Sequence, residues 1–150
     1  MNRRGFIGAT ALLASGVATD RVEIPVLRII DRNAHANAGG FISSIWKEAG
    51  EVFGRGGIML RVIDRSGEVL QYPSGRPIFR CLDRSRINVV LTDRVPLDWD
   101  KGRSLAGVSA LYEGFCICVI SMNEAHGNQI PFIAVNTVVH ELLHVLLEDV

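Results

Sequence analysis

Two histidines and a glutamate near the end of the sequence have the spacing of a metal site. His140 and His144 are four residues apart, and Glu141 follows the first histidine directly. On a helix, residues four apart lie about 6 Å apart along the axis, so both imidazoles can reach one ion. Glu141 is turned by about 100° from His140, so its carboxylate can flank the ion and serve as a general base. The pattern predicts a Zn²⁺ site that activates water.

The segment that holds these residues is predicted to be a helix running from Ala134 to Val150. No Gly or Pro interrupts it, and leucines favour a helical backbone. Its polar residues recur at steps of three and four and form one stripe: Thr137, His140, Glu141, His144 and Glu148. The rest of the circumference is apolar, which predicts a helix inside the domain. Burying imidazoles and carboxylates is costly without partners, and this favours a functional site over a plain core helix.

The motif H-E-x-x-H resembles that of the zincin-type, metzincin-like zinc metallopeptidases. Thr137, Val138 and the aliphatic residues around both histidines also match the residue preferences of that family. The resemblance implies hydrolysis of peptide bonds by a metal-activated water, with His140 and His144 as zinc ligands and Glu141 as the general base. It further implies a peptide or protein substrate.

The predicted order of elements is also similar to the N-terminal part of the zincin fold. Strands are expected at residues 22–31, 58–64, 87–91 and 115–121, and an amphipathic helix at 41–53. The stretches 65–85 and 93–107 are expected to be loops. We therefore predict an α+β domain: a mixed twisted sheet of about four strands, one packing helix and a central helix carrying the motif. By the same resemblance, strand 115–121 would be the edge strand that pairs with an extended peptide.

The metal ligands identified from the sequence are two of the three that a catalytic zinc site normally has. Metzincins place a glycine and a third ligand three and six residues after the second histidine, where this chain has Leu147 and Val150. Glu148 is about 12 Å from His140 along the predicted helix, too far to share an ion. His35 and His126 are candidates in loops, where an ordinary exposed histidine is the more common role.

We therefore expect the third ligand to lie beyond Val150, with the domain truncated at its C-terminus and the helix still running there. The alternative is a non-catalytic or inactive zincin-like fragment that acts as a binding module. Such a module would hold zinc weakly or not at all. Zinc analysis of the purified chain would discriminate, because stoichiometric metal that is lost on His144→Ala supports the enzyme.

The N-terminus is predicted to be an export signal over residues 1–18, with the domain occupying 19–150. Arg3 and Arg4 precede the short apolar stretch that begins at Phe6, as in twin-arginine signals, although Asn2 stands where Ser or Thr is usual. A generic secretory signal and an uncleaved anchor are the alternatives. We expect an exported protein, periplasmic or extracellular, with no stable membrane span once the signal is removed.

Composition excludes a basic nucleic-acid binder, because 16 basic residues balance 16 acidic ones. The 150 residues are 48% hydrophobic, enough for the core of one domain. Three cysteines allow at most one internal disulfide, between Cys81 and either Cys116 or Cys118, and these last two share a face if they lie on a strand. Small buried hydrophobic residues are the alternative role for them.

Overall fold

The structure, a computed structural model, describes residues 21–32, 39–71, 73–93, 95–102, 105–122 and 131–147. The described elements, in chain order, are β1 (Val22–Asp31), α2 (Gly39–Arg55), β2 (Ile58–Gly67), β3 (Val69–Gln71), β4 (Pro77–Phe79), β5 (Ile87–Thr92), α3 (Leu97–Asp100), β6 (Gly107–Tyr112), β7 (Phe115–Ser121) and α5 (Pro131–Leu146). The expected α+β class and mixed sheet are confirmed.

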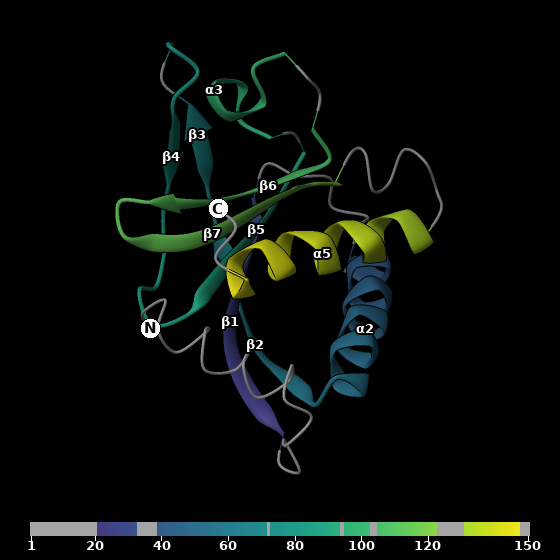
Figure 1. The fold of residues 1–150 in the computed structure, drawn as a ribbon. Coiled ribbons are helices and arrows are strands. Elements are labelled where there is room, and N and C mark those ends of the chain that lie inside the picture. Colours follow the sequence, from purple (N-terminus) through teal and green to yellow (C-terminus); the bar gives the residue numbers. More distant parts are fainter. Residues whose placement is uncertain are drawn as a thin grey trace.

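Five of the strands form one sheet in the order β2-β1-β5-β7-β6 (Figure 1). Within this sheet, β2, β1, β5 and β7 run parallel to one another, and β6 runs antiparallel to β7. The parallel pairing of β1 with β2 is the arrangement expected from the strand–helix–strand order of the sequence. β3 and β4 form a separate antiparallel pair.

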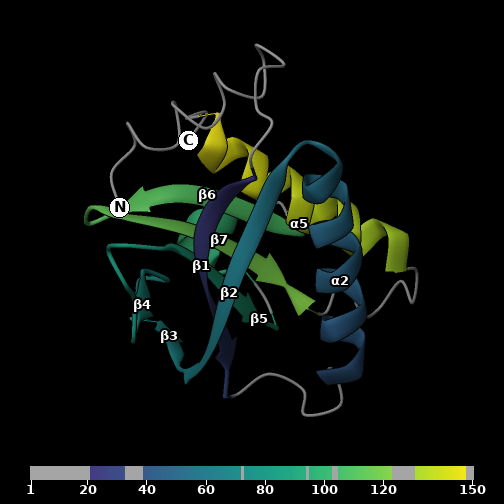
Figure 2. The same ribbon diagram turned by 90° about the horizontal axis from the view of Figure 1, so that it is seen from below.

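The main sheet is covered on both faces. All six residues of β5 are buried, as expected for a parallel strand with packing partners above and below it. On one face, the apolar sides of α2 and α5 pack together over β1, β5 and β7, with Trp46 and Leu142 in the same core (Figure 2). On the other face, a smaller core joins Val90 and Val119 to residues of the β3–β4 pair and α3, including Phe79 and Trp99.

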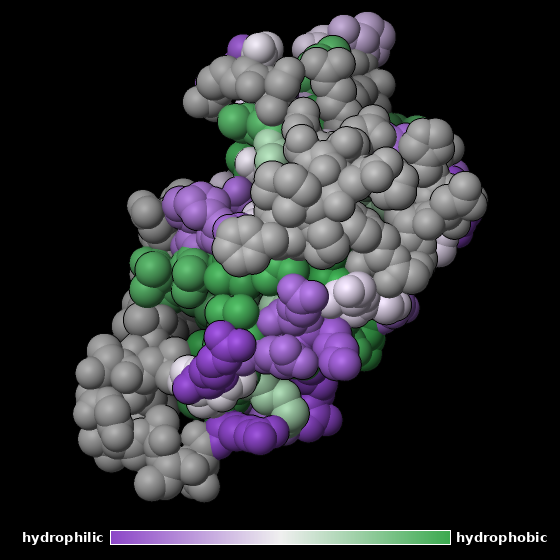
Figure 3. Space-filling model, turned by 90° about the vertical axis from the view of Figure 1, so that its right-hand side faces the viewer, coloured by the Kyte–Doolittle hydropathy of each residue, from purple (hydrophilic) through white to green (hydrophobic). Residues whose placement is uncertain are grey.

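The helix predicted at residues 41–53 is α2, and it is amphipathic as expected. Ile42, Ile45 and Ala49 are buried against the sheet, while Lys47 and Glu48 are exposed. Figure 3 views the molecule from the side on which α2 and α5 lie, and hydrophilic and apolar residues occupy separate zones of that surface. Helix α2 thus forms an outer layer whose polar side is turned to solvent.

The edge of the sheet differs from the prediction. Residues 115–121 form β7, but β7 lies between β5 and β6, so the strand at the edge is β6. The predicted loop 93–107 is followed by β6, which was not anticipated, and it contains the short helix α3. Strand β6 pairs with β7 through a tight turn that places Tyr112 opposite Phe115. Both residues of this turn, Glu113 and Gly114, have positive φ. Two consecutive left-handed residues are typical of a two-residue hairpin.

The stretch from residue 65 to 85 was also wrong in the prediction. The expected loop 65–85 begins inside β2, which continues to Gly67, and then contains β3 and β4. The described part of the chain therefore has seven strands in two sheets, instead of about four in one.

The motif helix also differs from its prediction in bounds and burial. Helix α5 begins at Pro131 and ends at Leu146, instead of running from Ala134 to Val150. Proline suits the first helical position, where its missing N–H costs nothing. The helix was expected inside the domain, but Leu143 and Leu147 are 40% and 57% exposed. Because α5 covers one face of the sheet, only the side of the helix that faces the sheet is buried.

Several predictions concern residues outside those that the structure describes. They are the export signal at 1–18 and three side chains considered as ligands: His35, His126 and Glu148. Among the helices of the described residues, none combines the length and the apolar character needed to cross a membrane.

Two neighbouring leucines of α5 provide a test of this packing. Leu142 is fully buried and Leu143 is 40% exposed. We expect Leu142→Ala to lower the free energy of unfolding by about 2–5 kcal/mol, because it leaves a cavity between α5 and the sheet. Leu143→Ala makes the same chemical change and should cost less than about 1 kcal/mol. Urea denaturation measures both, and equal losses would contradict the observed orientation of α5.

Candidate functional site

The candidate site is formed by the outward side of α5 and by β6. The buried residues Val138, Leu142 and Val145 fix the rotation of α5 against the sheet. This rotation turns His140 and His144 away from the core, with His140 exposed and His144 half-buried. The same rotation turns Glu141 toward β6, where it is only 5% exposed.

The two histidines approach each other as the sequence predicts. Their Nε2 atoms are 2.9 Å apart, and the ring centroids are 4.4 Å apart with the ring planes perpendicular. Two imidazole nitrogens on one tetrahedral zinc ion are about 3.3 Å apart, given Zn–N distances of about 2.0–2.1 Å. The observed separation is shorter than this, and it is also the distance of a hydrogen bond between the two rings, whose donor and acceptor depend on the tautomers. The two nitrogens are thus close enough together to reach a single ion.

The carboxylate of Glu141 is held by β6. Oε2 of Glu141 accepts a hydrogen bond from the Ser109 hydroxyl at 2.6 Å, and the same hydroxyl is 2.8 Å from the main-chain oxygen of Glu141. Among the described residues, Oε1 has no hydrogen-bond partner. The group suited to the role of general base is therefore buried, oriented and left with one oxygen available.

The side chain of Glu141 packs closely against the backbone of Gly107. A Cβ atom placed on Gly107 would lie 2.8 Å from Cγ and 3.1 Å from Oε1 of Glu141, and 3.1 Å from Cγ2 of Thr137. A larger residue would thus displace either the glutamate or the strand. Glycine at this position allows β6 and α5 to approach closely beside the motif.

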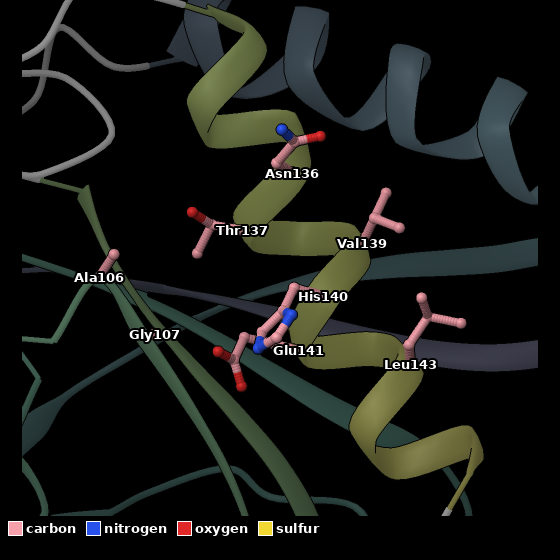
Figure 4. A pocket seen from close by; sticks show the side chains of 8 residues that line it. All are labelled: Ala106, Gly107, Asn136, Thr137, Val139, His140, Glu141 and Leu143. Carbon is pink, nitrogen blue, oxygen red and sulfur yellow. The ribbon is translucent and has the colours of Figure 1, made fainter.

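An open cleft of about 640 Å³ runs between the start of β6 and α5 (Figure 4). The residues that line it are Ala106, Gly107, Asn136, Thr137, Val139, His140, Glu141 and Leu143. In Figure 4, Thr137, His140 and Glu141 lie on the side of the helix nearer to Ala106 and Gly107. His140 and Glu141 are the ionisable groups of this lining, and most of the other residues are small or apolar.

The structure brings together the three residues singled out from the sequence, but it adds no third ligand. Within the residues that the structure describes, no group of three or more His, Cys, Asp or Glu side chains could hold a metal ion. His140 and His144 would supply two of the three protein ligands that a catalytic zinc site normally has.

Sequence reasoning missed Ser109 and Gly107, which contact Glu141 from another part of the chain. The signal that could have located them is the Glu113–Gly114 turn, because it marks a hairpin whose first strand is β6. The alternation of side chains along β6 would then have placed Gly107, Ser109 and Leu111 on one face.

The cysteines form no disulfide in the structure. Cys81 is exposed, Cys116 is half-buried and Cys118 is buried. Cys116 and Cys118 belong to the same side of β7, as expected, and face the core beneath the helices. The thiol of Cys118 is 3.4 Å from the main-chain oxygen of Glu141 and contributes to the packing under the motif. Its role agrees with the small buried hydrophobe considered from the sequence.

Comparisons of the chain with protein-family models, curated proteins and solved structures found no match. The features that bear on function are therefore those of the site itself: the paired imidazoles, the oriented carboxylate and the cleft beside them.

Cys118 makes stability depend on pH. Desolvation is the main cause that raises the pKa of its thiol to about 12 from the ordinary 9.0. Above pH 9 the unfolded chain loses this proton while the folded chain keeps it, so the unfolded state is favoured as pH rises toward 12. We expect the free energy of unfolding in this range to fall more steeply in the wild type than in Cys118→Ala, by on the order of 1 kcal/mol per pH unit. The exposed Cys81→Ala variant should retain the wild-type slope, and a Cys118→Ala slope equal to the wild type would refute the assignment.

The close approach at Gly107 predicts opposite effects for two glycine substitutions. Gly107→Ala forces its new methyl group against Glu141, and we expect it to lower the free energy of unfolding by about 1–3 kcal/mol. Gly50→Ala in the interior of α2 meets nothing within 4 Å, and it should raise stability by about 0.5–1 kcal/mol because alanine favours the helix. Thermal unfolding of the two variants measures the signs, and a stable Gly107→Ala protein would contradict the described contact.

Proposed function

We propose that this chain is a zinc-dependent peptidase of zincin type, in which His140 and His144 hold the metal and Glu141 is the general base. The observation that carries the proposal is the approach of the two Nε2 atoms to 2.9 Å on the open side of α5. Two imidazoles in this arrangement, next to a buried carboxylate, are the ligand and base types of zinc hydrolases.

Zinc, when bound, supplies a Lewis acid that polarises the scissile carbonyl and activates water. Both histidines must present an unprotonated Nε2 to the ion, so each carries its proton on Nδ1. Glu141 accepts a proton from the attacking water through Oε1, the oxygen that Ser109 leaves available, and then returns it to the leaving amine. The low exposure of Glu141 limits competition from bulk water for its remaining oxygen.

The sheet edge at β6 supports a peptide as the substrate. As the last strand of the sheet, β6 has backbone groups on its outer side with which an extended peptide can pair by strand addition. The cleft begins where β6 starts, so a peptide laid along this edge passes His140 and Glu141. This role, expected at residues 115–121, is here assigned to β6.

We also propose that the domain works after export, on the strength of the paired arginines Arg3 and Arg4 and the apolar stretch that follows them. A peptidase kept outside the cytoplasm acts on extracytoplasmic proteins or peptides.

Three variants test the proposed function in the full chain. Glu141→Gln should retain stoichiometric zinc and lose at least about a hundredfold in peptide hydrolysis, because the amide cannot accept the proton. His144→Ala should lose the zinc itself, as should wild-type protein treated with a chelator. Glu51→Gln, an exposed carboxylate on α2, is the matched control and should leave both properties unchanged. Metal content by mass spectrometry and cleavage of a quenched fluorescent peptide library are the measurements.

The outcomes separate the proposal from its alternative, a non-catalytic zincin-like binding module. Folded wild-type protein that stays metal-free in excess zinc would overturn both the metal site and the peptidase. Zinc bound through His140 and His144 without hydrolysis of any library peptide would support the binding module.

A further inference from the structure

Ser109 connects the sheet edge to the motif helix. It lies on β6 opposite Cys118 of β7, with its side chain on the face that α5 covers. Its hydroxyl reaches two atoms of Glu141: Oε2 at 2.6 Å and the main-chain oxygen at 2.8 Å. A single side chain therefore contacts both the backbone and the carboxylate of the residue proposed as the general base.

The surroundings make this contact stronger than a surface hydrogen bond. Glu141 is 5% exposed and Cys118, beneath it, is fully buried, so little water competes for the hydroxyl. A hydrogen bond from a neutral donor to a carboxylate is shorter and stronger than one between neutral groups, and a low local dielectric strengthens it further. The 2.6 Å distance agrees with such a charge-assisted bond.

The two oxygens of Glu141 have different roles in this arrangement. Oε2 is engaged by Ser109, whereas Oε1 lies beside the Gly107 backbone and has no hydrogen-bond partner among the described residues. A glutamate side chain has three rotatable bonds, and fixing it in one conformation has an entropic cost that a strong hydrogen bond offsets. Without Ser109, the carboxylate would adopt several orientations relative to the cleft.

We infer that Ser109 is a positioning residue, whose hydroxyl anchors Oε2 of Glu141 so that Oε1 is oriented toward the proton it must accept. The inference rests on the proposed function for its catalytic consequence, while the anchoring contact itself does not require activity. Ser109 is not among the residues that line the cleft, so it acts through Glu141. Substrate affinity and metal affinity should therefore be unaffected by its loss.

Steady-state kinetics of the zinc-loaded chain test the catalytic consequence of the contact between Ser109 and Glu141. Ser109→Ala should lower kcat about 10- to 100-fold, since a misplacement of about 1 Å at a reacting group has an effect of that order. KM and zinc stoichiometry should stay within twofold of the wild type. Ser109→Thr keeps a hydroxyl on the strand and should recover most of the lost kcat. Ser66→Ala, at an exposed position on β2, is the matched control and should leave kcat unchanged.

Two kinetic results would overturn the inference. One is an unchanged kcat in folded Ser109→Ala. The other is a parallel loss of kcat, of zinc and of substrate affinity, which would indicate a general structural role. A selective fall in kcat that Ser109→Thr reverses supports positioning.

A double-mutant cycle in the metal-free chain tests the contact without relying on activity. Ser109→Ala, Glu141→Ala and the double variant are unfolded in urea at pH 7. Glu141→Ala keeps the main-chain oxygen, so the coupling reports the bond to Oε2 alone. We expect a coupling of about tenfold in the unfolding equilibrium constant, the size typical of a hydrogen bond to a charged group.

The cycle also separates the two proposals. Coupling below twofold would overturn the role of Ser109 whether or not the chain hydrolyses peptides. Tenfold coupling in a chain that binds no zinc and cleaves nothing would support the anchoring of Glu141 by Ser109 and overturn the peptidase.

Discussion

The rotation of α5 about its own axis is the constraint on which the site depends. Val138, Leu142 and Val145 lie on one side of the helix and are buried in the core that α2 and the sheet share. Because residues on a helix are related by about 100° per position, burying these three determines where every other side chain points. His140 and His144 are thereby directed outward on adjacent turns, and Glu141 is directed sideways at β6. The geometry of the proposed metal site therefore follows from apolar packing.

Pointing the side chain of Glu141 toward β6 would raise the free energy of the folded state if its carboxylate had no hydrogen-bond partner there. Glu141 as a whole is only 5% exposed, and burying a carboxylate has a large free-energy cost unless hydrogen bonds replace its hydration. Ser109 provides one such bond, and Gly107 allows the strand to approach closely enough for it to form. Because α5 and β6 both surround this carboxylate, the orientation of Glu141 and the distance between helix and strand are linked.

The spacing of apolar and polar residues along the sequence was sufficient to predict several helices and strands of this fold. Strands β1 and β7 and the amphipathic α2 were predicted closely, because both strands are rich in β-branched and other apolar residues and the helix carries an apolar stripe. The spacing of His140 and His144 was sufficient to predict the approach of their imidazoles, since one helical turn determines it. Contacts between distant segments were not predictable in this way. The partner of Glu141 is 32 residues earlier in the chain, and nothing near the motif specifies it.

The two edges of the five-stranded sheet differ in charge. β2, at one edge, carries Arg61, Asp64 and Arg65, and ion pairs join Arg61 to Glu23 and Asp64 to Arg28 of β1. The sequence of β6, at the other edge, is Gly-Val-Ser-Ala-Leu-Tyr and has no charged residue. Charged edge strands discourage the addition of a further strand, whereas uncharged ones permit it. Self-association of the folded protein is therefore expected to begin at β6, and any chain already paired with that strand would suppress aggregation.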